Sequence, residues 1–426
     1  MDQGNTAFIL IAAALVLLMT PGLAFFYGGL VKAKSVISMM MMSFGAMGLI
    51  GVLWVLFGYA ISFANGGTDG YIGIDGLVGI DVANLGLAGL LETPEDAAFP
   101  PLAFVAFQAT FAIITVALIS GAIADRAKFG AWMIFAGVWA TLVYFPVASW
   151  VFNFTLDPET LAFTDGGWIT YGMQEAFGVG AIDFAGGTAV HINAGAAALA
   201  LALVLGKRVG FQKGAHVPHN PPFVLLGAGL LWFGWFGFNA GSELAADGTA
   251  ALAFVNTIAA PAAALLAWLV VEKVRDGKPT SVGAASGAVA GLVAITPACA
   301  SLTPFWAIVL GLVAGAVCAL AIDLKFKFGF DDSLDVVGIH LVGGLIGTLY
   351  LGFFANGTGL IYSGDATQLM VQAIAAFSVM AFSFVLSYAI GWAIQKTIGF
   401  RVKNEDEIAG IDTVVHGEEG YKLETV

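Results

Sequence analysis

Two histidines are the residues most able to do chemistry, because both lie inside apolar stretches long enough to cross a bilayer. His191 lies in DFAGGTAVHINAGAAALALALVLGKR, and His340 lies in DDSLDVVGIHLVGG. Titratable side chains at membrane depth are costly and are functional candidates by default. A neutral imidazole carries one donor and one acceptor nitrogen, so two facing rings could hand a small hydrogen-bonding solute along a narrow path. The alternative is two separate core histidines, each hydrogen-bonded to a neighbouring helix.

Each histidine follows an Asp-x-x-Gly pattern, which begins at Asp183 in one span and at Asp335 in the other. An inverted repeat would bring the two histidine-bearing spans together near the middle of the bilayer. Eight helical residues leave Asp183 and His191 roughly 80° apart, so the two side chains do not share a face. We therefore expect Asp183 and Asp335 to be structural caps, where a carboxylate meets the positive end of a helix dipole.

Aromatic side chains form a second group of candidates. Phe107 and Phe111 lie one helical turn apart on one face. The stretch LLWFGWFGFNAGS carries five aromatic rings from Trp232 to Phe238. Ordinary packing against lipid or core is one interpretation. A hydrophobic gate with a cation–π site for a small cation is the other.

Composition excludes several classes of protein. Of the 426 residues, 59% are hydrophobic and 11% are charged, whereas soluble chains carry about 25% charged residues. The net charge of −13 provides no basic surface for nucleic acid. Cys299 and Cys318 make no disulfide framework. No nucleophile–base motif or metal cluster is recognisable, so we predict neither an enzyme nor a bound cofactor.

Eleven segments are apolar and long enough to span a membrane of ordinary thickness. They are residues 5–31, 37–63, 100–123, 129–151, 186–206, 222–242, 249–271, 281–299, 304–324, 335–356 and 367–395. The expected fold is an all-α polytopic membrane protein, with a five-plus-five inverted repeat and a C-terminal helix. The inverted halves cover about 5–206 and 222–356, and the last helix covers 367–395. The transmembrane domain is thus residues 1–395, followed by a polar tail at 396–426.

The basic residues support this count, because they cluster after every second span, beginning with the first. The clusters are Lys32 and Lys34; Arg126 and Lys128; Lys207, Arg208 and Lys213; Lys273, Arg275 and Lys278; Lys325 and Lys327; and Lys396, Arg401, Lys403 and Lys422. The intervening loops contain none. The positive-inside rule then predicts a multi-pass protein of the cell membrane with an outer N-terminus and a cytoplasmic C-terminus.

Several long blocks in order resemble the ammonium transporter (Amt/Mep/Rh) family, on its bacterial Amt side. The strongest is residues 183–208, and TPGLAFFYGGL, FQATFAIITVALISGAIADR, GWFGFNAGS, DVVGIH and the tail RVKNEDEIAGIDTVVHGEEGY support it. The resemblance implies an ammonium channel or transporter that assembles as a homotrimer with one pore per subunit. It also implies methylammonium as a substrate analogue, and the tail suggests a PII-type signalling protein as a cytoplasmic partner.

The resemblance also implies roles for single residues. His191 and His340 match the twin pore histidines, and Phe107 and Phe238 match the two gating phenylalanines. The recruitment site for ammonium would comprise Phe107, Ser242, Asp183 beneath it and Trp235 beside the gate. Phe152 stands where the family usually has a tryptophan of that site, in PVASWVF. Phenylalanine offers a weaker cation–π face and no N–H donor, so Trp150 is a second candidate for that role.

The implied mechanism is binding of the ammonium cation outside, loss of its proton and passage of neutral ammonia through the twin-histidine pore. Proton movement through the histidine pair remains an open alternative. A sensor that signals through the tail, with acidic residues such as Asp406 and Glu418, is a second hypothesis. A generic ion-coupled transporter is a third, and a membrane enzyme is the least favoured.

Overall fold

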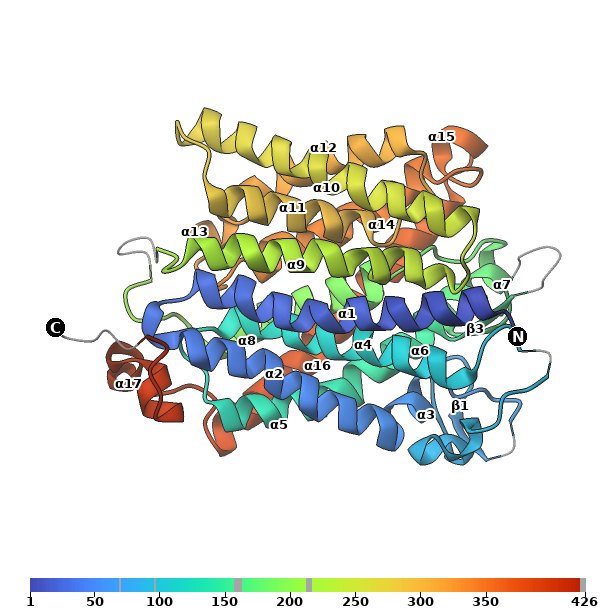
Figure 1. The fold of residues 1–426 in the computed structure, drawn as a ribbon, viewed down its shortest axis with the longest axis horizontal. Helices are drawn as coiled ribbons and strands as arrows, with labels where there is room; N and C mark the ends of the chain where they lie inside the picture. Colours follow the sequence, from blue (N-terminus) through green and yellow to red (C-terminus); the bar gives the residue numbers. More distant parts are fainter. Residues whose placement is uncertain (69, 96, 157–162, 212–216, 422–426) are drawn as a thin grey trace.

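The computed structural model describes all residues except 69, 96, 157–162, 212–216 and 422–426. Lys213 and Lys422, which belong to two of the basic clusters, lie outside the described residues. The molecule is a bundle of long helices that are roughly parallel or antiparallel to one another (Figure 1).

The helices of the bundle follow the predicted apolar segments. The α-helices are α1 (Gln3–Leu30), α2 (Val36–Leu53), α3 (Tyr59–Ser62), α4 (Pro101–Ile119), α5 (Phe129–Trp139), α6 (Phe145–Phe152), α7 (Met173–Phe177), α8 (Asn193–Leu205), α9 (Pro221–Ala240), α10 (Gly248–Arg275), α11 (Ser281–Ile295), α12 (Pro304–Ala321), α13 (Leu324–Phe328), α14 (Val342–Phe354), α15 (Leu360–Ser363), α16 (Thr367–Thr397) and α17 (Asn404–Ala409). In the described part of the chain, ten helical segments are long and apolar enough to cross a membrane. The remaining predicted span, residues 281–299, corresponds to α11, an apolar helix of 15 residues.

Short π and 3-10 turns interrupt or extend these helices. The π turns are η2 (Trp54–Gly58), η5 (Ala140–Tyr144), η6 (Trp168–Gly172), η7 (Gly187–Ile192), η9 (Val337–Leu341) and η10 (Asp412–His416), and the 3-10 turns are η1 (Ala33–Ser35), η3 (Val82–Leu90), η4 (Ser120–Ile123) and η8 (Gly241–Glu243). Both histidine-bearing spans begin with a π turn. Such turns are rare and often mark functional sites.

Local sequence signals explain where several helices begin and end. The carboxylate of Asp2 accepts a hydrogen bond from the Asn5 N–H at the start of α1, and Asp247 accepts from two N–H groups at the start of α10. Helices α4, α9 and α12 begin with proline, whose missing N–H costs nothing in a first turn. Gly206 ends α8 in a positive-φ conformation.

Two short antiparallel hairpins occupy the loops between spans at one end of the bundle. Strand β1 (Tyr71–Ile74) pairs with β2 (Val78–Asp81), and β3 (Phe154–Leu156) pairs with β4 (Phe163–Gly166). These elements and the N-terminus lie at the same end, whereas α13 and α17 lie at the other (Figure 1). The two loops that carry these hairpins, which contain no Lys or Arg, therefore lie at the same end of the bundle as the N-terminus.

Small residues bring the helices close together. A Cβ atom on Gly227 of α9 would lie 2.2 Å from the backbone nitrogen of Phe26 on α1. One on Gly311 of α12 would lie 2.2 Å from the Ala260 carbonyl oxygen of α10. Any residue with a side chain at these positions would force the paired helices apart. Close approach through small residues is common where membrane helices associate.

Candidate functional site

The two predicted histidines meet inside the bundle. His191 on η7 and His340 on η9 place their Nδ1 atoms 3.2 Å apart, with ring centroids separated by 5.3 Å. Both side chains are almost fully buried. One Nδ1 must donate to the other, so one ring presents its Nε2 as an acceptor and the other presents an Nε2–H donor. The pair can therefore accept a hydrogen bond from one solute and donate one to another.

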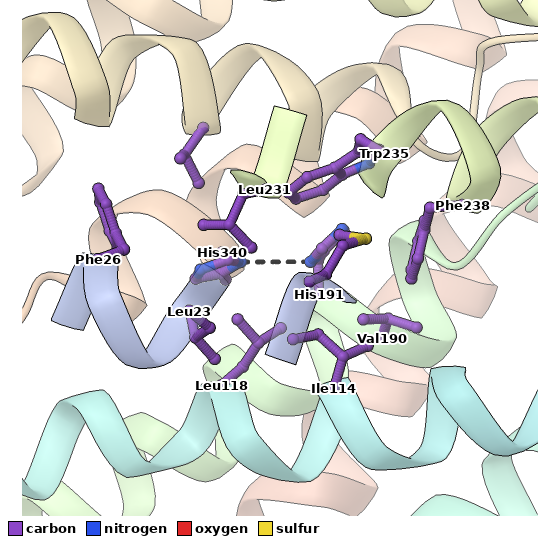
Figure 2. A pocket seen from close by; sticks show the side chains of 12 residues that line it. Leu23, Phe26, Ile114, Leu118, Val190, His191, Leu231, Trp235, Phe238 and His340 are labelled. Atoms are coloured by element: carbon purple, nitrogen blue, oxygen red, sulfur yellow. Dashed lines mark hydrogen bonds between the residues drawn. The ribbon is translucent and has the colours of Figure 1, made fainter. Parts of the chain in front are cut away.

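The histidine pair lines a narrow, largely apolar cavity (Figure 2). The lining residues are Met19, Leu23, Phe26, Ile114, Leu118, Val190, His191, Leu231, Trp235, Phe238, Val289 and His340. The cavity offers about 10 Å³ to the centre of a water-sized molecule, which is roughly the space one such molecule needs. The Nε2 atom of His191 is buried and has no hydrogen-bond partner in the described part of the chain. A small polar solute could supply that partner.

The cavity has an ordered series of side chains along its length. Phe26, His340, His191 and Phe238 follow one another across the view, so the two imidazoles lie between two aromatic rings (Figure 2). Trp235 lies beside His191, with ring centroids 5.5 Å apart, and its indole N–H donates to the Thr296 hydroxyl over 2.8 Å. That hydrogen bond fixes the indole against the histidine. Trp235 thus lies beside the predicted gate rather than in an open recruitment site.

The ring stacked on Phe238 is Phe111, whereas the family resemblance pairs Phe107 with Phe238 as the two gating rings. The centroids of Phe111 and Phe238 are 4.1 Å apart and their planes differ by 14°. Phe107 instead meets Phe111 edge-on, at 4.8 Å. Because Phe107 precedes Phe111 by one turn of α4, it lies one layer further toward the end of the bundle that carries the N-terminus. The difference arises because both rings share one helix face, so the sequence does not identify which one reaches α9.

Phe107 and Ser242 approach the same turn. A Cβ atom on Gly241 would lie 3.0 Å from the Phe107 ring, so this ring packs directly against η8. The hydroxyl of Ser242, the next residue, donates to the Phe238 carbonyl oxygen over 2.8 Å, and the residue is partly exposed. Its oxygen retains lone pairs that could accept from a cation. The structure therefore brings these two predicted recruitment residues together.

Phe152 and Trp150 have different surroundings. Phe152, the last residue of α6, meets the Phe111 ring edge-on, with centroids 6.0 Å apart. Trp150 packs against Trp168 and Phe382, and its indole N–H donates to the Leu77 carbonyl oxygen. The Trp150 ring therefore joins the β1–β2 hairpin to α16. Phe152 is the ring that borders the Phe111–Phe238 stack.

The Asp183 carboxylate caps the first turn of its span, as expected. It accepts hydrogen bonds from the backbone N–H groups of Gly186, Gly187, Thr188 and Ala189 and from the Thr188 hydroxyl. In the other span, the carboxylate that accepts from the first turn is Asp332, which binds the Val337 N–H over 2.7 Å. Asp335 instead pairs with the Lys325 ammonium. The cap expected at Asp335 is thus provided by a residue three positions earlier.

Known proteins place this architecture in a family. The model of the Ammonium Transporter Family matches residues 7–421. The chain belongs to the ammonium transporter family. It is 54% identical to an ammonium transporter of Mycobacterium tuberculosis, over 99% of this chain and 90% of the relative. It is 44% identical to an ammonium transporter of Bacillus subtilis, over 99% of both chains.

Solved structures agree with the family assignment. The chain superimposes on a protein titled Sensor Amt Protein with a TM-score of 0.86 and 28% identity, covering 96% of this chain and 98% of the other. It superimposes on Mep2 of Saccharomyces cerevisiae with a TM-score of 0.82 and 31% identity, covering all of this chain and 92% of the other. This ammonium transporter is therefore a multi-pass membrane protein.

Two residues of the site escaped prediction from the sequence of this ammonium transporter. The sequence shows Phe111 only as a ring on the same face as Phe107, and the Asp-x-x-Gly pattern points to Asp335 rather than Asp332. A usable signal for Asp332 was present, because Asp183 and Asp332 each precede a pore histidine by eight residues. In the described part of the chain, no group of three or more His, Cys, Asp and Glu side chains is placed to hold a metal ion.

Proposed function

We propose that this protein recruits ammonium at an outer vestibule, removes one proton and conducts ammonia past His191 and His340. The observation that carries the proposal is the pair of hydrogen-bonded imidazoles inside a cavity of about 10 Å³ with mostly apolar walls. The cavity matches a molecule of the size of ammonia or water. Its walls offer hydrogen bonds at the histidines and little else.

The apolar cavity favours ammonia over ammonium for a physical reason. Moving an unpaired cation from water into an apolar environment costs many kcal/mol, and no carboxylate lines this cavity to offset the cost. Ammonia is neutral and can both donate and accept hydrogen bonds, so the two Nε2 atoms can guide it. Potassium has no proton to lose. It would therefore be rejected at the same barrier.

The proposed outer vestibule consists of Phe107, Ser242 and Phe152, and the proposed gate is the stacked pair Phe111 and Phe238. Ring faces and a hydroxyl oxygen can bind a small cation through cation–π attraction and a hydrogen bond. The tight stack then closes the way into the cavity. This assignment is supported by the contacts of Phe107 with η8 and of Phe152 with Phe111.

The orientation and the repeat belong to the same proposal. Turn η9 packs against α8, and η7 packs against α14, so the two histidine-bearing spans run antiparallel, as an inverted repeat requires. The distribution of Lys and Arg supports an outer N-terminus and a cytoplasmic tail. Eleven spans are obtained if α11 crosses the membrane with its flanking turns.

A homotrimer and a PII-type cytoplasmic partner are further parts of the proposal, and both rest on the family resemblance. Mass measurement of the purified protein in detergent tests the first, and pull-down with a PII-type protein tests the second. The sensor alternative has little support, since the curated relatives cited above are named ammonium transporters. Deleting residues 401–426 should alter regulation while a conducting pore remains.

Uptake of radiolabelled methylammonium into proteoliposomes tests the proposed function. We expect His191→Ala and His340→Ala to reduce initial uptake strongly, since each removes one of the two polar atoms that guide the solute. The matched control is His416→Ala, which removes an imidazole from the tail and should leave uptake near the unsubstituted level. Uptake that survives both pore substitutions would refute the proposal. Current recorded on ammonium addition separates charge-carrying from neutral transport.

A further inference from the structure

The two histidine-bearing spans carry matching carboxylates on opposite sides of the imidazole pair. Asp183 and Asp332 each precede a pore histidine by eight residues. Each carboxylate accepts a hydrogen bond from the N–H five residues later, over 2.8 Å at Thr188 and 2.7 Å at Val337. Since the spans run antiparallel, the two carboxylates lie on opposite sides of the histidines. Asp332 is therefore at the end that the proposed orientation assigns to the cytoplasm.

The two carboxylates differ in how completely they are bonded. Both oxygens of Asp183 accept hydrogen bonds from backbone N–H groups. Asp332 is 1% exposed, and only its Oδ2 is bonded to Val337. Its Oδ1 is buried with no hydrogen-bond partner among the described residues. A proton on this oxygen would remove a buried negative charge and would turn the oxygen into an O–H donor without a protein acceptor, from which the lone pair of a small solute could accept.

The groups around Asp332 favour a proton there. Asp335 and Lys325 are its charged neighbours, and the Lys325 ammonium is held by the Asp335 carboxylate and by the Asp332 carbonyl oxygen over 3.2 Å. Burial, with a further contribution from the Asp335 charge, raises the pKa of Asp332 to about 6, and Lys325 opposes the shift. A group with such a pKa exchanges protons readily near neutral pH.

Tyr27 lies near the start of the span that carries Asp332, and its neighbour in sequence lines the histidine cavity. Phe26, the preceding residue, lines the cavity. A Cβ atom on Gly121 would lie 2.6 Å from the Tyr27 ring and 2.8 Å from the Val336 side chain. The tyrosine ring thus packs near the start of the span that Asp332 caps, and its hydroxyl donates to the Leu118 carbonyl oxygen over 3.0 Å. Two consecutive residues of α1 thus lie near the cavity and near the start of the span that carries Asp332.

We propose that Asp332 donates a proton to ammonia as it leaves the inner end of the pore. The step breaks the O–H bond of the carboxylic acid and forms an N–H bond with the lone pair of ammonia. The products are ammonium and a carboxylate beside Lys325, and a hydronium ion from the cytoplasm restores the acid. Ammonia is a stronger base than a carboxylate, so the transfer is downhill and traps the solute as a cation. This inference rests on the proposed function.

The test is methylammonium uptake into proteoliposomes whose internal buffer is varied at constant external pH. Asp332→Asn keeps an oxygen for the Val337 N–H but cannot donate an acidic proton. We expect its uptake to fall several-fold below the unsubstituted protein at an internal pH of about 8 and to recover at about 6, where the buffer supplies protons. The matched control is Asp323→Asn, an exposed carboxylate paired with Arg275, which should follow the unsubstituted profile.

The outcomes separate this inference from the proposed function. If His340→Ala abolishes uptake but Asp332→Asn matches the unsubstituted protein at every internal pH, only the inference fails. An equal loss at every internal pH indicates a structural role and also overturns it. If Asp332→Asn does not fold, Lys325→Met serves instead. Removing that cation favours the protonated carboxyl and should move the internal-pH profile upward; an unmoved profile overturns the inference.

Discussion

Phe107 and Phe111 illustrate how two like residues on one helix face acquire different tasks. Phe111 stacks on Phe238 across helices, whereas Phe107 meets η8 beside Ser242. The stack closes the cavity by dispersion and by exclusion of water. The outer ring remains next to a hydroxyl that can accept from a cation. The two positions should therefore respond differently to truncation.

We expect Phe111→Ala to weaken discrimination between ammonium and potassium by about tenfold or more, because lowering a desolvation barrier by ~1.4 kcal/mol changes a rate tenfold. Phe107→Ala should instead raise the concentration of methylammonium at half-maximal uptake and leave discrimination intact. Uptake assays with potassium as a competitor or a measured co-substrate distinguish the two effects. If Phe107→Ala alone opened the pore to potassium, the assignment of the gate would be wrong.

A substitution at Phe152 should lower, rather than raise, the methylammonium concentration at half-maximal uptake. Its ring borders Phe111 and lacks an N–H donor. Replacement by tryptophan adds a stronger cation–π face, for which about 0.5–1 kcal/mol is the lower part of the usual range. We expect Phe152→Trp to lower the half-saturating methylammonium concentration about two- to fivefold. Phe305→Trp, at a ring that is 64% exposed, is the control and should change nothing; an unchanged value for both variants would contradict the prediction.

For single residues, the sequence predicts which side chains are functional candidates better than it predicts which side chains contact each other. His191 and His340 could be singled out because a titratable group inside an apolar span is rare. Phe111 could not be separated from Phe107, since their common face is a property of α4 alone and the stack depends on where α9 lies. Asp335 looked like the cap because of its glycine three residues later, but Lys325 holds its carboxylate.

Among the elements, η7 and η9 do most to position the site. Each π turn forms the first turn of a histidine-bearing span. In each, an aspartate carboxylate accepts a hydrogen bond from the backbone N–H of the residue five positions later. The hydrophobic pattern predicts both spans. It does not predict a π turn, because these spans are apolar on all faces and the pattern has no period that a wider turn could change. The end of α11 was also missed, since TPACAS is apolar enough to extend the span while the chain actually turns at Thr296.

Arg208 joins two of the turns at the inner end of the bundle. Its guanidinium binds the carboxylates of Asp125 over 3.1 Å and Asp331 over 2.9 Å, and all three side chains are at most 4% exposed. Arg208→Met would leave two buried carboxylates without their cation, at a cost of about 3–5 kcal/mol. We expect a markedly lower thermal unfolding midpoint in detergent. Arg275→Met, which breaks exposed pairs with Asp276 and Asp323, should cost about 0–1 kcal/mol; similar losses in both variants would contradict this.

The same ion pair predicts how stability depends on acid. Burial alone would raise the pKa of Asp331, but the Arg208 guanidinium outweighs it and holds the pKa below the ordinary value. A carboxyl whose pKa is lowered by folding stabilises the protein above its unfolded pKa of about 3.9, and the contribution disappears as pH falls through the folded value. The thermal midpoint of the unsubstituted protein should therefore fall more steeply below about pH 4 than that of Asp331→Asn. Parallel curves would refute the assignment.

On the scale of the whole molecule, the tail crosses the end of the bundle opposite the N-terminus and contacts segments from distant parts of the chain. The Val402 N–H donates to the Arg126 carbonyl oxygen, and the Val209 N–H donates to Glu407. The Lys34 ammonium donates to the Ile408 carbonyl oxygen over 2.7 Å. The sequence predicted a polar segment that cannot cross lipid, but not these contacts. They depend on loops that only the folded bundle brings together.

One of these contacts is a helix cap supplied from the other end of the chain. Ser35, at the start of α2, makes no side-chain cap. Both oxygens of Asp412 instead accept from the N–H groups of Ile37 and Ser38, over 3.0 and 2.7 Å. The tail thus completes a helix of the transmembrane domain. Loss of that cap should loosen the tail without disturbing a pore whose lining lies within the bundle.

Asp412→Asn tests this coupling, because asparagine keeps one acceptor oxygen and leaves one of the two N–H groups unsatisfied. A lost cap costs about 1 kcal/mol, which corresponds to a roughly fivefold shift in the docking equilibrium. We expect faster hydrogen exchange across residues 404–417, with methylammonium uptake through the pore retained. The control is Glu418→Gln, at an exposed residue beyond η10, which should leave exchange unchanged. If Asp412→Asn exchanged no faster than this control, the tail would be held by its other contacts, and the cap would stabilise α2 alone.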